Sequence, residues 1–193
     1  MTRRLFIGIT FPDEAADALV ADQAALSPHL KTGRASSREN LHLTLIFLGE
    51  VDEDVERRVR DAVKATAAAS HPLTLCLGDI GSFDHHDRLV LWRGIQSGAG
   101  LDELRSLQAR LVEELLDRGV GFEDRAYRPH ATLVRNARLE GKEPHVVRPV
   151  SFDVKAIRLM WSHHPEGGRL TYTPVFSAEL GTGAPDADDG LAR

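Results

Sequence analysis

Apolar residues recur along the chain with two periods, and these periods predict its elements. Compact or alternating apolar runs, typical of strands, occupy residues 5–9, 41–48, 73–77, 89–92, 127–135, 150–161 and 172–180. Apolar positions three or four apart, typical of amphipathic helices, occupy residues 13–27, 52–69 and 101–115. The polar segment 31–40 and the segment 81–88 are predicted to be connections.

The order of these elements indicates the fold class. Helices and strands alternate, but several strands are joined by short turns, which favours an α+β fold with mostly antiparallel sheets. The segment His42-Leu43-Thr44-Leu45-Ile46-Phe47 returns 88 positions later as His130-Ala131-Thr132-Leu133-Val134-Arg135. We therefore predict one domain over residues 1–180, made of two similar lobes that each carry one His-x-Thr strand. Residues 181–193 are predicted to form a disordered acidic tail.

Composition and charge narrow the class of protein. With 42% apolar and 27% charged residues, the 193-residue chain is typical of a globular domain. Its 24 basic and 29 acidic residues give a net charge of −5, so any contact with nucleic acid must be local and involve few phosphates. The sequence has one cysteine, no recognisable export signal and no apolar run long enough to span a membrane. These features predict a cytoplasmic protein without a membrane contact, and we expect a monomer.

The repeated motif carries the candidate chemistry. Side chains two apart on a strand share a face, so His42 lies with Thr44 and His130 lies with Thr132, while the apolar residues between them face the core. Two histidines can act as one general base and one general acid near neutral pH. Two threonine hydroxyls can donate hydrogen bonds to phosphate oxygens. This set suits in-line cleavage of a phosphodiester.

Metal catalysis competes for the same histidines. Each strand supplies a single imidazole, and no His-Glu-x-x-His motif or cysteine pair accompanies it. We therefore predict a site without a metal and an activity without a cofactor, in which the threonines and an arginine balance the charge of the phosphate.

These segments resemble those of a known family. Residues 41–51 together with 128–135 resemble the two motifs of the two-histidine (HxTx) phosphoesterase superfamily, in particular the RNA 2′,3′-cyclic phosphodiesterases, also known as 2′-5′ RNA ligases. Residues 4–9, 90–92 and 171–175 also resemble segments of that family, and the tail from Gly181 lies outside the resemblance.

The resemblance implies a fold and a reaction. It implies two lobes flanking a central cleft, with helices on the outer faces, and metal-free hydrolysis of a 2′,3′-cyclic phosphate to a 2′-phosphomonoester. His42 would be the proton donor and His130 the proton acceptor, and Thr44 and Thr132 would bind the phosphate. Arg135 would contact the phosphate as well. The implied partners are RNA or oligonucleotide ends that carry the cyclic phosphate, or small cyclic nucleotides.

Two of the implied residues conflict with the simple alternation of a strand. Arg135 is five residues from His130, so a continuous strand would place the two on opposite faces unless it ends or bends near Val134. Phe47, which the resemblance places beside a nucleobase, is likewise five residues from His42. A surface arginine and a core phenylalanine are the alternatives.

Two other functions are compatible with the same residues. A binding module could capture a nucleotide or an RNA end without turning it over. A 2′-5′ RNA ligase could run the reverse reaction in the same site, with a 5′-hydroxyl in place of water. The formation of a 2′-phosphate product would separate hydrolysis from mere binding.

Overall fold

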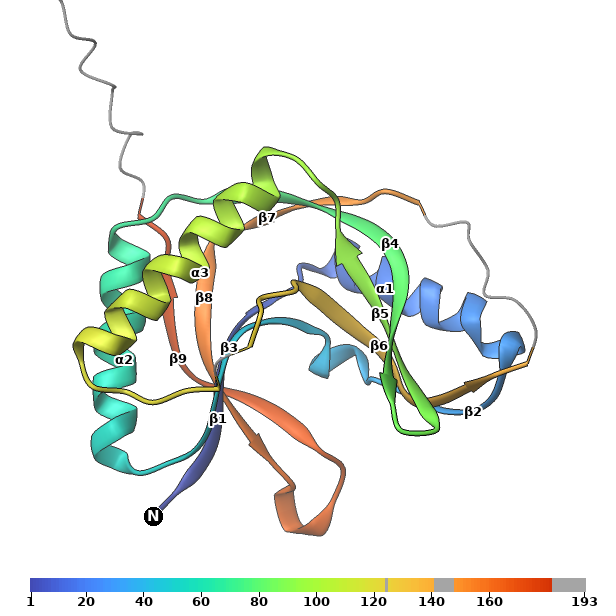
Figure 1. Ribbon diagram of the computed structural model, residues 1–193, viewed down its shortest axis with the longest axis horizontal. Coiled ribbons are helices and arrows are strands. Elements are labelled where there is room, and N and C mark those ends of the chain that lie inside the picture. The colour runs from blue at the N-terminus through green and yellow to red at the C-terminus, as the bar shows by residue number, and fades with distance from the viewer. Residues whose placement is uncertain (124, 141–147, 182–193) are drawn as a thin grey trace, which may run out of the picture.

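One curled antiparallel sheet organises the computed structural model, which describes residues 1–123, 125–140 and 148–181 (Figure 1). The described residues form nine strands and three α-helices. The strands are β1 (Arg3–Thr10), β2 (Leu30–Ala35), β3 (His42–Val51), β4 (Leu73–His85), β5 (Arg88–Ile95), β6 (His130–Leu139), β7 (Ser151–Val154), β8 (Ala156–His163) and β9 (Thr171–Glu179). The α-helices are α1 (Asp13–Leu26), α2 (Glu53–Ala68) and α3 (Ala99–Asp117). The predicted α+β class with antiparallel strands is confirmed.

The strand order places the two His-x-Thr strands side by side. The sheet runs β7-β4-β5-β6-β3-β1-β8-β9, so the two His-x-Thr strands, β6 and β3, are neighbours at its centre. β2 joins the sheet as an additional partner of β6. Two long hairpins, β4–β5 and β8–β9, extend from the two halves toward the same side of the molecule (Figure 1).

Helices cover the two halves from outside. α2 and α3 pack against each other, and α2 contacts β8 and β9, whereas α1 contacts β6 and β7 (Figure 1). The five leucines that predicted α3 are all buried, as the amphipathic pattern requires. Asp52 caps the N-terminus of α2, where its side chain accepts hydrogen bonds from the backbone N–H groups of Asp54 and Val55. The apolar side chains of the sheet and the buried faces of the helices together form one hydrophobic core.

Several predicted boundaries are wrong, and each error has a physical cause. Residues 31–40, expected to be a loop, contain β2 and a short 3-10 helix at Arg38–Asn40. β2 has no apolar pattern because it is held by backbone pairing to β6 and its side chains are mostly exposed. The expected connection 81–88 belongs largely to the β4–β5 hairpin. The expected strand 150–161 is broken at Lys155 into β7 and β8.

The division of the chain stays a prediction in two respects. A single two-lobed domain over residues 1–180 is compatible with the continuous sheet. The predicted acidic tail, apart from Gly181, lies outside the described residues. Within those residues, no helix combines the length and apolar character needed to cross a membrane.

Candidate active site

The two His-x-Thr motifs meet through a single registered residue pair. Leu43 of β3 lies opposite Ala131 of β6 in an antiparallel pairing, and both are fully buried. Because the two strands run in opposite directions, His42 lies opposite Thr132, and Thr44 lies opposite His130. Because Leu43 and Ala131 point into the core, the four polar side chains share the opposite face.

His42 is held by a carbonyl, a hydroxyl and two aromatic rings. Its Nδ1 lies 2.7 Å from the backbone oxygen of Asn40, and its Nε2 lies 3.1 Å from Oγ1 of Thr44. The ring centroids of Phe6 and Tyr172 lie 4.7 Å and 4.9 Å from that of His42. Phe6 comes from the neighbouring strand β1, and Tyr172 comes from the β8–β9 hairpin.

His130 has a matching environment in the other half. Its Nδ1 lies 2.6 Å from the backbone oxygen of Arg128. The ring centroids of Phe83 and Trp92 lie 4.9 Å and 6.1 Å from that of His130. Phe83 belongs to β4 and Trp92 to β5, so each of the two long hairpins contributes an aromatic ring beside one histidine.

The two carbonyl contacts define which nitrogen is available for chemistry. A carbonyl oxygen only accepts hydrogen bonds, so in both histidines Nδ1 carries a proton and donates it. The neutral form of each ring therefore presents Nε2 as a proton acceptor. The aromatic surroundings fix the orientation of the rings without competing for that nitrogen.

Burial lowers the pKa of both histidines. The pKa of His42 falls from 6.5 to about 4 because burial disfavours its charged form, and the charges of Arg135 and His130 lower it further. The pKa of His130 is also lowered, first by burial and then by Arg135. The charge of Arg135 thus acts on both histidines, and pKa values below 6.5 favour the neutral form of both rings in the free protein near pH 7.

A β-bulge at the same place in both motifs resolves the alternation problem. On β3, Gly8 and Ile7 of β1 are registered with Thr44 and Ile46, which leaves Leu45 as an extra residue. Leu45 and Ile46 are consecutive yet both buried. A bulge reverses the alternation of side chains beyond it, so Phe47 returns to the face of its histidine.

β6 repeats this bulge. Trp92 and Leu91 of β5 are registered with Thr132 and Val134, which leaves Leu133 as the extra residue. Leu133 and Val134 are both buried, and Arg135 returns to the face of its histidine. The backbone oxygen of Leu133 accepts hydrogen bonds from the backbone N–H of Ser36 (2.9 Å) and from Nε2 of Gln23 (2.9 Å).

Both residues in question lie beside the motifs. Arg135 is half-buried and is close enough for its charge to lower the pKa of both histidines. Phe47 is half-buried, and the guanidinium carbon of Arg4 lies 4.8 Å from the centre of its ring. The bend that the sequence required near Val134 is present.

Sequence reasoning missed one residue that organises the site. The side chain of Asn40 donates a hydrogen bond to the backbone oxygen of Leu170 (2.7 Å) and accepts one from the backbone N–H of Tyr172 (3.0 Å). Its backbone oxygen accepts the proton of His42. Asn40 therefore ties the β8–β9 hairpin to His42. Its position two residues before the histidine is the only trace in the sequence, since its partners are backbone groups 130 and 132 positions away.

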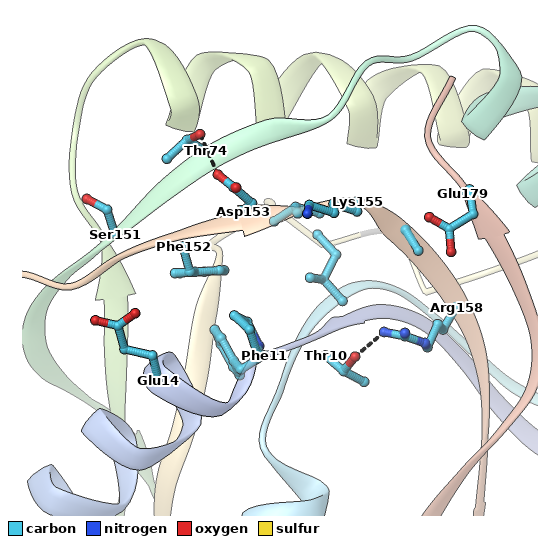
Figure 2. Close-up of a pocket in the computed structure, with 14 residues that line it drawn as sticks. Thr10, Phe11, Glu14, Thr74, Ser151, Phe152, Asp153, Lys155, Arg158 and Glu179 are labelled. Atoms are coloured by element: carbon cyan, nitrogen blue, oxygen red, sulfur yellow. Dashed lines mark hydrogen bonds between the residues drawn. The ribbon is translucent and has the colours of Figure 1, made fainter. Parts of the chain in front are cut away.

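A pocket of about 560 Å³ lies at a different place, between the end of β1, the start of α1, β7 and the start of β8 (Figure 2). Thr10, Phe11, Phe152, Lys155 and Arg158 are among its lining residues, and none of the predicted site residues lines it. The described residues contain no cluster of three potential metal ligands. A metal-free site stays a prediction.

The comparison with protein families matches most of the chain. Residues 11–166 match the model of the 2′-5′ RNA ligase superfamily. The chain belongs to this superfamily. The proposed resemblance to it is thereby confirmed, and so is the α+β fold that it implies.

Individual members of the superfamily align with the chain over different lengths. An Escherichia coli protein named RNA 2′,3′-cyclic phosphodiesterase is 31% identical over 178 residues, which cover 90% of this chain and 94% of that protein. A Geobacillus stearothermophilus protein of the same name is 30% identical over 140 residues, which cover 72% of this chain but 43% of that protein. These relatives are named as enzymes.

Two solved structures show the same fold. The crystal structure of Escherichia coli LigT complexed with 3′-AMP has a TM-score of 0.78 and 28% identity, and the match covers 93% of this chain and 99% of that one. A Thermus thermophilus structure has a TM-score of 0.75 and 26% identity, with 92% and 97% covered. The curled antiparallel sheet is thus shared with both of these structures.

Proposed function

We propose that this protein is an RNA 2′,3′-cyclic phosphodiesterase that hydrolyses 2′,3′-cyclic phosphate ends to 2′-phosphomonoesters. The observation that carries the proposal is the single pairing of Leu43 with Ala131, which brings two histidines and two threonines onto one face of adjacent strands. The names of the relatives and the LigT complex with 3′-AMP support a substrate that is a nucleotide or an RNA end.

The reaction needs a base and an acid on opposite sides of phosphorus. His130 takes a proton from water at Nε2 as the water oxygen bonds to phosphorus. The bond between phosphorus and the 3′ oxygen breaks, and His42 donates the proton that turns this oxygen into a hydroxyl. One water is consumed, the phosphate remains on the 2′ oxygen, and the proton gained by His130 returns to His42 through solvent before the next turnover.

His42 must carry a proton when it acts as the acid. Its low pKa in the free protein disfavours that proton, but a phosphodiester anion beside the ring favours the charged form. Substrate binding therefore promotes the protonation that the chemistry requires. The assignment of the donor to His42 and of the acceptor to His130 follows the superfamily resemblance.

The remaining residues bind the substrate. Thr44 and Thr132 donate hydrogen bonds to the oxygens of the phosphate, and Arg135 balances its negative charge. Phe47 packs beside the terminal nucleobase, with Arg4 on its ring. These groups serve without a metal or another cofactor. We further propose that the protein acts as a monomer in the cytoplasm.

The proposal is tested with an oligonucleotide that ends in a 2′,3′-cyclic phosphate. His42→Ala and His130→Ala are each expected to lower turnover at least about a hundredfold, because each removes one proton transfer. The product must be a 2′-phosphate, and turnover must persist in EDTA. Unchanged turnover in either variant would refute the proposal, as would binding without product. Loss of activity in EDTA with recovery on adding a divalent ion would indicate a metal enzyme.

A further inference from the structure

Two arginines face each other beside the candidate active site. Arg34 of β2 is registered directly opposite Arg135 of β6 in an antiparallel pairing. Residues opposite each other in such a pair have their Cβ atoms roughly 5 Å apart, and like charges in this position are destabilising. Two arginines in direct opposition therefore suggest an anion that offsets their repulsion.

Strand geometry places both arginines on the face that carries the histidines. The bulge at Leu133 returns Arg135 to this face. A Cβ atom on Gly33 would lie 2.7 Å from the buried side chain of Val134, so a side chain at Gly33 would point toward the buried face of β6. Its neighbour Arg34 must then face the other way, toward Arg135.

The charge of this pair is not neutralised by the protein. Within the described residues, neither Arg34 nor Arg135 forms an ion pair with a carboxylate. By contrast, Arg138, farther along β6, and Arg88 of β5 share the single carboxylate of Asp87. The chain as a whole carries a net charge of −5, so this concentration of unpaired positive charge runs against its composition.

We propose that Arg34 binds the phosphate on the 5′ side of the terminal nucleotide, which makes an oligonucleotide the preferred substrate over a cyclic mononucleotide. This inference rests on the proposed function, in which Arg135 contacts the reacting phosphate. Arg34 lies one strand farther from the histidines, on the same face, where the next phosphate of a bound strand can reach it. A guanidinium suits this role because it donates two parallel hydrogen bonds to a phosphate.

Three substrates distinguish the contribution of the charge on the 5′ phosphate from the contribution of the additional nucleotide. The first is a cyclic mononucleotide, the second is a dinucleotide that ends in the cyclic phosphate, and the third is the same dinucleotide with an uncharged methylphosphonate linkage. For the wild-type protein, kcat/KM is expected to be about tenfold higher on the charged dinucleotide than on the mononucleotide or the methylphosphonate dinucleotide. Arg34→Gln is expected to remove this preference and to leave the mononucleotide rate unchanged.

Control variants distinguish this role from a general effect of charge. Arg57→Gln removes a similarly exposed arginine on α2, remote from β2 and β6, and is expected to leave all three rates unchanged. Arg34→Lys keeps the charge and should retain part of the preference. The dependence of kcat/KM on salt should also be weaker for Arg34→Gln on the charged dinucleotide.

The outcomes also separate this inference from the proposed function. Equal kcat/KM on the charged and the methylphosphonate dinucleotides, or an equal loss on all substrates in Arg34→Gln, would overturn the role of Arg34 while the hydrolase remains. If no substrate is turned over, the proposed function fails. The role of Arg34 is then judged by the affinity for a labelled dinucleotide with a 2′-phosphate end. A drop of about tenfold in Arg34→Gln supports that role, and an unchanged affinity overturns it.

Discussion

Leu43 lies directly opposite Ala131, and this pair is the point at which the two similar strands of the protein meet. Because the pairing is antiparallel, each threonine of one motif neighbours the histidine of the other. A phosphate bound between the rings would therefore have one hydroxyl on each side. The relationship makes the two motifs one site.

The two hydroxyls are predicted to contribute to turnover separately. Thr44→Val and Thr132→Val each remove a hydrogen bond to a charged phosphate, so kcat/KM on a cyclic-phosphate oligonucleotide should fall by about ten- to a hundredfold. Serine at either position should retain most of the activity. Thr74→Val, on the exposed part of β4, is the control. Wild-type rates in both site variants would contradict a phosphate contact.

Asn40 is predicted to act as a positioning residue for His42. Asn40→Ala removes both hydrogen bonds to the β8–β9 hairpin, so Tyr172 should withdraw from His42 and water should reach the ring. The pKa of His42 should then rise from about 4 toward 6.5, even though Arg135 and His130 still face it. An NMR titration of the imidazole measures this shift.

A purely structural role for Asn40 would give a different result. In that case the protein would lose stability, but the pKa of His42 and the shape of the pH profile would not change. Asn40→Asp still accepts from the N–H of Tyr172 but cannot donate to Leu170, and its carboxylate favours the charged form of His42, so the pKa of His42 should rise at least as far as in Asn40→Ala.

Gln23 is predicted to stabilise the bulge that positions Arg135. Its amide donates to the backbone oxygen of Leu133, the extra residue of β6, and to that of Ser36. Gln23→Ala leaves a partly buried carbonyl with one donor fewer, which should lower kcat/KM several-fold more than kcat because Arg135 binds substrate. Gln108→Ala, a partly buried glutamine on α3, should change neither constant. Equal kinetics in both variants would exclude a positioning role.

The pH dependence of the rate is predicted to differ between kcat and kcat/KM. The ratio kcat/KM reports the free protein, in which the pKa of His42 is about 4, whereas kcat reports the complex. A bound anion raises the pKa of His42 and so increases its protonated fraction in the complex, and kcat should therefore persist to a higher pH than kcat/KM. A kcat and a kcat/KM that fall at the same pH on the basic side would contradict His42 as the acid next to the phosphate.

Stability is predicted to fall as the pH decreases from 7 to 5. The pKa of His42 is about 4 in the folded protein and 6.5 when exposed, so in this window the unfolded chain binds a proton that the folded protein does not. The free energy of unfolding should therefore drop by about 2 kcal/mol from this group alone. Denaturant unfolding of His42→Gln should show a smaller drop, and an identical pH slope in the two proteins would contradict the burial of a neutral His42.

The two motifs and their faces followed from the sequence. A histidine and a threonine two residues apart on a strand share a face whatever the rest of the fold does, because the alternation is local. The leucine pattern of α3 and the antiparallel α+β class could likewise be predicted, because residues that are buried at regular intervals are apolar at the same intervals in the sequence. The superfamily could also be predicted from the sequence, because the residues of each motif are consecutive in the chain.

Only the tertiary structure decided where Phe47, Arg135, Arg34 and Asn40 lie. The bulges at Leu45 and Leu133 depend on the registers of neighbouring strands, and no local sequence pattern predicts such an extra residue. β2 was missed because its backbone, not its side chains, holds it to β6. Asn40 bonds to backbone groups more than a hundred positions away, and backbone groups carry no sequence signal. Local periodicity is a property of the sequence, whereas strand register and long-range backbone contacts exist only once the sheet has formed.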